Sequence, residues 1–240
     1  MAVWKSSSPR NSSRARRMAM DPIRIAVDVA GGDFGVPVVL EGVLRARERW
    51  RGQFTCVLCG ERQEVFDGLA AHGVRLPADD LLIEHCPDRI ESSDVPSVAW
   101  RKRARASIVR CIALQSEGRV DASFGAGDTG ILMAAAHFIL GCSKGVTRPA
   151  LAATIPTMSG SRALLLDVGA NTNCRPEHLL SFGKLGREYM RRFYGTKQPR
   201  VALLNIGEEP TKGSRVVSAA AGMLASSCPG YAGFVEGNRV

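Results

Sequence analysis

The feature that most constrains the fold is a regular alternation of short apolar runs with longer segments of helical periodicity. β-Branched and aliphatic runs that end in Gly, Asp or Asn cover 23–29, 54–60, 80–86, 120–126, 161–170 and 200–207, with 231–237 as a further candidate. Segments of helical period cover 38–50, 62–72, 97–117, 130–140, 176–194 and 214–226. This alternation predicts a mostly parallel, doubly wound sheet with helices on both faces, a three-layer α/β/α fold. Ligands of such folds bind at the carboxyl ends of the strands, where the Gly and Asx clusters lie.

Composition and charge narrow the class of protein. The 240 residues are 45% hydrophobic, and their longest apolar stretch, 130–140, is too short for the roughly 20 residues that span a bilayer. We therefore expect a soluble globular protein, and its expected location is the cytoplasm. Of the net charge of +9, residues 1–22 carry +4, from five bases and one acid. This Ser- and Arg-rich segment is expected to be a disordered basic leader, or upstream sequence read from a wrongly assigned start, with the folded domain over 23–240.

The remaining charge of +5 suits an anionic substrate or partner without requiring nucleic acid. Aromatic residues make up only 6% and do not alternate with bases, so a stacking surface for single strands is not expected. The seven cysteines are odd in number, and the CxxC of Cys56 and Cys59 lies in an apolar run without a second pair of ligands. They are interpreted as buried free thiols of a reducing compartment, with no metal site.

The first candidate site follows the first strand and contains Asp28, Gly31, Gly32 and Asp33. The two glycines would let the backbone approach a ligand closely, and the carboxylates could orient it. A tight turn with two solvated acids explains the same residues equally well.

The second candidate site is a GxGxxG pattern over 125–130, which contains Gly127, Asp128, Thr129 and Gly130. A strand precedes it and a helix follows it, so free N–H groups at the helix start would suit a phosphate. A dinucleotide would also require an acid about 20 residues later, where this chain has bases at 144–149. A phosphate or polar pocket is therefore favoured over a dinucleotide site.

A run of five bases between residues 100 and 110 forms a third feature: Arg101, Lys102, Arg103, Arg105 and Arg110. Apolar residues flank these bases, which suggests an amphipathic helix. The run is either a solvated helix face or a site for phosphate or an acidic protein.

Two later strand ends carry the same Gly and Asx chemistry, and the strand ends together are expected to outline one cleft. Their candidate binding residues are Asp167, Gly169, Asn171, Asn205, Gly207 and Lys212. No Ser–His–acid or Cys–His set is recognisable, and the four histidines are interpreted as structural.

Several of these segments, in order, resemble the bacterial phosphate acyltransferase family. They include DVAGGD, PSVAWRKRARAS, FGAGDTGILMAAA and LLLDVGANTNCRPEHLLSFG. The resemblance covers about 23–240 and implies an α/β/α fold related to phosphotransacetylases and isocitrate dehydrogenases. It implies transfer of a fatty acyl group from acyl carrier protein to inorganic phosphate, which gives acyl phosphate for phospholipid synthesis. A homodimer with peripheral membrane contact and no metal or organic cofactor is expected.

The implied chemistry agrees with the residues present. Phosphate is itself a nucleophile, so the protein must position it against the thioester carbonyl and stabilise the developing oxyanion. The catalytic candidates are Arg103, Ser107, Asp128 and Thr129. A basic surface would also attract an acidic carrier protein.

The chain departs from the family pattern at several polar positions. Asp128 stands where the family has Asn, and a carboxylate beside phosphate is repulsive unless it is protonated or paired. Ala104 and Ala106 replace a base and a hydroxyl, and Phe34 replaces a His. Family members also continue beyond the position of Val240, so this chain is expected to lack a C-terminal part and to leave an open sheet edge or apolar face. An inactive or fragmentary relative that only binds acyl carrier protein is the alternative.

Overall fold

The computed structural model describes residues 2–3, 22–91, 94–209 and 212–240. The chain forms two compact units, Met1–Ser143 and Lys144–Val240, and each is described by itself. Most of the expected leader, 4–21, lies outside the described residues.

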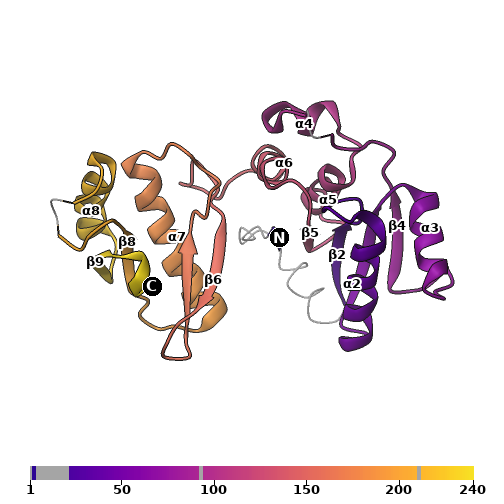
Figure 1. Cartoon of the computed structure of the whole chain (residues 1–240), viewed down its shortest axis with the longest axis horizontal. Coiled ribbons are helices and arrows are strands. Elements are labelled where there is room, and N and C mark those ends of the chain that lie inside the picture. Colours follow the sequence, from indigo (N-terminus) through magenta and orange to yellow (C-terminus); the bar gives the residue numbers. More distant parts are fainter. Residues whose placement is uncertain (1, 4–21, 92–93, 210–211) are drawn as a thin grey trace. The chain divides into compact units, whose positions relative to one another are not determined.

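The first unit is built on a five-stranded sheet in the order β1-β5-β2-β3-β4 (Figure 1). Its strands are β1 (Ala2–Val3), β2 (Ile23–Asp28), β3 (Phe54–Gly60), β4 (Leu81–His85) and β5 (Ala122–Gly125). The four longer strands are parallel, and β1 pairs antiparallel with β5. Because the parallel strands share a direction, the loops after β2 and β5 leave the same edge of the sheet.

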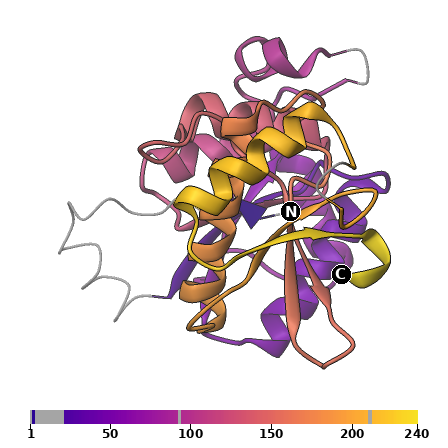
Figure 2. The same cartoon turned by 90° about the vertical axis from the view of Figure 1, so that its left-hand side faces the viewer.

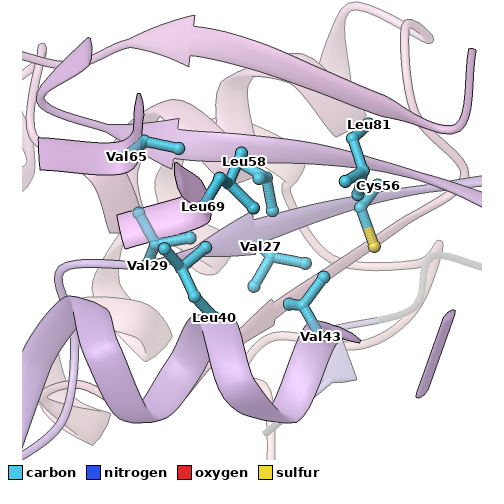
Figure 3. Packing of buried hydrophobic residues seen from close by; sticks show 9 residues of the cluster. All are labelled: Val27, Val29, Leu40, Val43, Cys56, Leu58, Val65, Leu69 and Leu81. Carbon is cyan, nitrogen blue, oxygen red and sulfur yellow. The ribbon is translucent and has the colours of Figure 1, made fainter. Parts of the chain in front are cut away.

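Helices cover both faces of this sheet, as the alternating sequence predicts. They are α2 (Gly35–Arg49), α3 (Arg62–Ala71), α4 (Pro96–Lys102), α5 (Ser107–Ser116) and α6 (Thr129–Ala135), which continues as the π-helix η1 (Ala136–Leu140). On one face, side chains of β2, β3 and β4 pack against α2 and α3, as Figure 3 shows for nine core residues, among them Val27, Leu40 and Leu58. On the other face, Ala26 and Val57 pack against Leu114 of α5.

The predicted helix over 97–117 is wrong, because two helices occupy that range. The α4 helix ends at Lys102 with Arg103 as its C-cap, and a hydrogen bond from the Ala106 N–H to the Arg103 carbonyl (2.9 Å) closes the turn to α5. Tertiary contacts hold the turn, since Ala106 is buried and forms an isolated β-bridge with Asp88. Local propensity could not have predicted this break, because alanine favours helix.

The second unit contains β6 (Ala152–Pro156), β7 (Arg162–Leu166), α7 (Pro176–Tyr194), β8 (Val201–Leu204), α8 (Arg215–Ser227) and β9 (Tyr231–Val235), followed by a 3₁₀ turn, Gly237–Arg239. Strands β6 and β7 form an antiparallel hairpin, which can be followed in Figures 1 and 2. Strand β6 was not predicted from the sequence. Strands β8 and β9 are parallel, with α8 between them in sequence.

The α/β class with a mostly parallel sheet between helices is confirmed. The antiparallel β6–β7 hairpin is the exception in the second unit. Among the described residues, no helix has both the length and the apolar character that crossing a membrane would require.

Candidate functional site

The Asp28 carboxyl group lies at the carboxyl end of β2 and is 2% exposed. Burial raises its pKa, although hydrogen bonds from the Ser107 hydroxyl and from the N–H groups of Ala30 and Gly31 favour the charged form. Its Oδ1 atom is buried and has no hydrogen-bond partner among the described residues. Through these bonds, Asp28 connects the end of β2, the loop that follows it and the first turn of α5.

Two glycines let the loops after β2 and β5 meet at Asp28. A Cβ atom on Gly31 would lie 2.4 Å from Oδ2 of Asp28 and 2.8 Å from the backbone nitrogen of Gly127. A Cβ atom on Gly127 would lie 3.2 Å from the same Oδ2 atom and 3.4 Å from the Gly31 Cα. Gly32 has φ of +87° and would place a Cβ 3.3 Å from that of Ala126. Glycine is therefore required by close approach at Gly31 and by backbone conformation at Gly32.

We call the set of Asp28, Gly31, Gly32, Ser107 and Gly127 the strand-end site. The structure thus brings together five sequence candidates from three segments that lie far apart in the chain. Gly125 belongs with them, since its Cβ would lie 3.3 Å from the Asp28 Cβ. Gly125 was recognised as the first glycine of the GxGxxG pattern but was not among the predicted binding residues.

The next candidates, 128–130, begin the helix beside this site. Asp128 is the N-cap of α6, and its Oδ1 atom accepts a hydrogen bond from the Ile131 N–H at 2.7 Å. Thr129 and Gly130 are exposed, and a Cβ on Gly130 would lie 3.1 Å from Cγ of Pro96 in α4. Asp128 therefore has a structural role in starting the helix, which an asparagine would also fulfil.

The side chain of Arg103 does not lie free at the site. Its Nε atom donates to Asp94 (3.2 Å) and its Nη2 atom to Glu91 (3.0 Å). These two carboxylates offset its positive charge and connect the α4–α5 turn to the segment before α4. Asp33 and Phe34 are exposed, Phe34 to 77%.

In the second unit, Asp167 organises the turn after β7. Its carboxylate accepts hydrogen bonds from the N–H groups of Leu151 (3.4 Å), Ala170 (3.1 Å) and Asn171 (3.1 Å). Its φ of +49° is a left-handed conformation that Asp tolerates better than most residues. The Asn171 amide donates to the Pro149 carbonyl (3.0 Å), and its Oδ1 accepts from Arg148 (3.5 Å).

The turn after β8 is organised in a similar way by Asn205. Its amide donates to the carbonyls of Gly207 (3.1 Å) and Lys212 (3.0 Å). A Cβ on Gly213, where φ is +92°, would lie 2.2 Å from the Asn205 Oδ1 atom. The Lys212 side chain is exposed. Gly169 has φ of +106° and an open space where a Cβ would lie, so its requirement is conformational only.

The sequence candidates therefore fall into three local groups: the strand-end site with the start of α6, the turn after β7, and the turn after β8. That all of them face one cleft stays a prediction. In the described ranges, no group of His, Cys, Asp and Glu is placed to hold a metal ion. Cys56 and Cys59 are buried on β3, as predicted.

Known proteins resemble this chain along most of its length. A family model described as "Fatty acid synthesis protein" matches residues 23–240. A phosphate acyltransferase of Bacillus licheniformis is 39% identical over 214 residues, which are 89% of this chain and 63% of the relative. The phosphate acyltransferase of Salinibacter ruber is 40% identical over 84% of this chain and 59% of its own length. That of Vibrio vulnificus is 35% identical over 92% of this chain and 64% of its own length.

Two solved structures have a similar fold. The EutD phosphotransacetylase of Staphylococcus aureus and a branched-chain phosphotransacylase of Enterococcus faecalis V583 both superpose with a TM-score of 0.59 at 14% and 15% identity. Each comparison covers 89% of this chain and 67% of the other. At this identity, the similarity concerns the fold alone.

The chain spans about three fifths of the length of the curated relatives that it matches. The identities of 35–40% and the match of the "Fatty acid synthesis protein" family model to residues 23–240 show that the chain belongs to the phosphate acyltransferase family.

Proposed function

We propose that this protein transfers a fatty acyl group from acyl carrier protein to inorganic phosphate, as a step of phospholipid synthesis. A phosphate oxygen attacks the carbonyl carbon of the thioester, and a C–O bond forms. The C–S bond then breaks, and the carrier's thiolate leaves and takes up a proton. The products are acyl phosphate and the free carrier thiol. No metal or organic cofactor is required, because phosphate supplies the nucleophile.

The observation that carries this proposal is the strand-end site in a chain of this family. The loops after β2 and β5 approach each other closely beside Asp28, because Gly31, Gly32 and Gly127 carry no side chains. The exposed residues Thr129 and Gly130 begin α6, where N–H groups lack partners within the helix. We assign the phosphate and the developing oxyanion to these donors.

Other residues of the site act by positioning. Ser107 and Asp28 hold the first turn of α5 against the β2 loop. Because Asp94 and Glu91 neutralise Arg103, we assign this residue to holding the α4–α5 turn, and hence Ser107, in place.

The remaining proposed substrate-binding residues lie at the strand ends of the second unit. Asp167 and Asn205 fix their turns, so that Asn171 and the exposed Lys212 remain as groups that can meet substrate. Lys212 is the cation of this set, suited to phosphate as a point charge.

Further properties are proposed from the family alone. They are acyl carrier protein and inorganic phosphate as substrates, a homodimer, a location in the cytoplasm with peripheral membrane contact, and no nucleic acid partner.

The test is incubation of the full chain with long-chain acyl-acyl carrier protein, with and without phosphate. Acyl phosphate is trapped as the hydroxamate, and released carrier thiol is counted. We expect phosphate-dependent product, its loss in Gly127→Val, and its retention in Gly42→Ala, where a Cβ meets nothing within 4 Å. Folded protein that forms no product at any phosphate concentration would refute the proposal.

A second candidate function is carrier binding without catalysis, which the Asp128 carboxylate favours. This negative charge at the start of α6 would repel phosphate at the proposed site. This second function predicts that the chain binds carrier protein but forms no acyl phosphate, and that Asp128→Asn recovers the product.

A further inference from the structure

We propose that α4, the α4–α5 turn and η1 form the surface on which an acidic acyl carrier protein docks. We call it the α4–η1 surface; its members are Val95, Trp100, Arg101, Lys102, Arg105 and Phe138. The inference rests on the proposed function, because it names the place where that reaction's acyl donor binds.

The five bases are of two kinds, those with and those without an ion pair. Arg103 and Arg110 are both paired with carboxylates, Arg110 with Glu84 (2.7 Å) and Glu117 (2.6 Å). Arg101, Lys102 and Arg105 are exposed, and no ion pair joins them to a carboxylate of the described residues. Three positive charges without an ion pair to a described carboxylate therefore lie within five residues of the chain.

Apolar side chains lie next to these charges. Trp100 and Phe138 stack with ring centroids 4.9 Å apart and planes 12° from parallel. The Trp100 ring packs on the core, whereas Phe138 is 54% exposed and Val95 61%. The Arg101 guanidinium lies over the Trp100 ring, 5.3 Å from its centroid. An aromatic centre with a basic rim is the composition of a protein-binding surface.

The chemistry of this surface selects its partner. Three free cations attract an acidic protein over the Debye length and steer its approach. The acids nearest in sequence, Asp94 and Glu91, both pair with Arg103. A membrane is the less suitable partner, because interfacial anchors are longer amphipathic helices, and α4 has 7 residues.

The α4–η1 surface is continuous with the strand-end site. Pro96 of α4 lies beside Gly130 at the start of α6. Ser107, two residues after Arg105, donates to the Asp28 carboxylate. A carrier protein docked on these bases would therefore present its acyl thioester beside the proposed phosphate position.

The test compares two triple variants of the full chain. The surface variant is Arg101→Glu, Lys102→Glu and Arg105→Glu. The control variant, Arg49→Glu, Arg62→Glu and Arg75→Glu, reverses three exposed bases elsewhere in the same unit. Arg49 matches Arg101 closely, since it lies over the Trp50 ring at 5.0 Å. Binding of fluorescently labelled acyl-acyl carrier protein is measured by anisotropy at low and at high salt, and KM and kcat are measured in parallel.

We expect the surface variant to raise Kd and the KM for carrier protein at least about tenfold at low salt, with kcat little changed. The control should stay within about twofold of the unmodified chain, and added salt should shrink the difference. Phe138→Ser, which leaves the charge unchanged, should also weaken binding.

Equal weakening in both triple variants, or carrier binding that the surface variant leaves unchanged, would overturn the inference. The inference would also be overturned if the surface variant kept its carrier binding and lost only its binding to anionic phosphatidylglycerol vesicles, or only its self-association. The proposed function is judged separately: acyl phosphate formed with an unchanged KM refutes the docking surface alone. Carrier binding lost in the surface variant, without acyl phosphate from any variant, refutes the function alone.

Discussion

Substitution of Gly31 by alanine tests the close approach of the two glycine loops at the strand-end site. The new Cβ would lie 2.4 Å from the Asp28 Oδ2 atom and 2.8 Å from the Gly127 nitrogen. Ordinary contacts of a Cβ begin near 3.4 Å. Neither neighbour can move easily, because Asp28 is 2% exposed and the other atom belongs to the backbone.

The expected cost is that of overpacking a buried position. We expect Gly31→Ala to lower the free energy of unfolding of the first unit by about 1–3 kcal/mol. Gly42→Ala is the matched control, because Gly42 lies in α2 and nothing lies within 4 Å of its Cβ. Alanine's higher helix propensity should make that variant about 0.5–1 kcal/mol more stable.

Denaturant unfolding followed by tryptophan fluorescence measures both variants. Trp50 and Trp100 belong to the first unit, whereas all three tyrosines belong to the second; the remaining tryptophan, Trp4, lies outside the described residues. The signal therefore reports on the unit that carries the substitutions. An unchanged or higher midpoint for Gly31→Ala would refute the close approach, as would equal effects of the two substitutions.

Further predictions concern two carboxylates of the first unit and the thiols of both units. Asp128→Asn should keep the α6 cap and lower the KM for phosphate several-fold, as a phosphate titration of the activity would show. Asp128→Ala should lose the cap and about 1 kcal/mol of stability, which the urea midpoint measures. Because the folded-state pKa of Asp28 is raised, its contribution to stability is greatest below about pH 4 and is lost as the pH rises through the folded-state pKa. Asp28→Asn should therefore flatten the dependence of the urea midpoint on pH, and an unchanged slope would contradict this assignment. Burial raises the pKa of the Cys56 thiol to about 12, so this thiol should react slowly in the native protein. A thiol reagent should modify the half-buried Cys142 and Cys174 first, and mass spectrometry of the early adducts measures this order.

Strands β2 to β5 of the first unit could be predicted because each apolar run ends in a strong turn signal, whereas β1 falls in the segment expected to be disordered. The runs that became β2 and β3 were predicted within one residue of their bounds. The helix break at Arg103–Ala106 could not be predicted, because it depends on the contact of Ala106 with Asp88 and not on local preference. Strand β6 was missed because it forms only as the partner of β7, and its alternation of half-buried and exposed residues is short.

Site residues were predictable in type but not in role. Glycines after β2 and β5 were candidates because parallel strands end at one edge, and the structure brings Gly31 and Gly127 together. The pairing of Arg103 with Glu91 and Asp94 could not be predicted, since ion pairs depend on how separate segments pack. Likewise, a sequence cannot distinguish Asp128 as a helix cap from Asp128 as a ligand.

The most direct test of the account is a thiol count in the absence and presence of phosphate. If phosphate is the attacking group, acyl-acyl carrier protein mixed with stoichiometric amounts of this chain should keep its thioester intact until phosphate is added. One carrier thiol should then appear for each acyl phosphate trapped as hydroxamate. A stoichiometric burst of thiol without phosphate, with the acyl group covalently attached to the chain, would contradict the account.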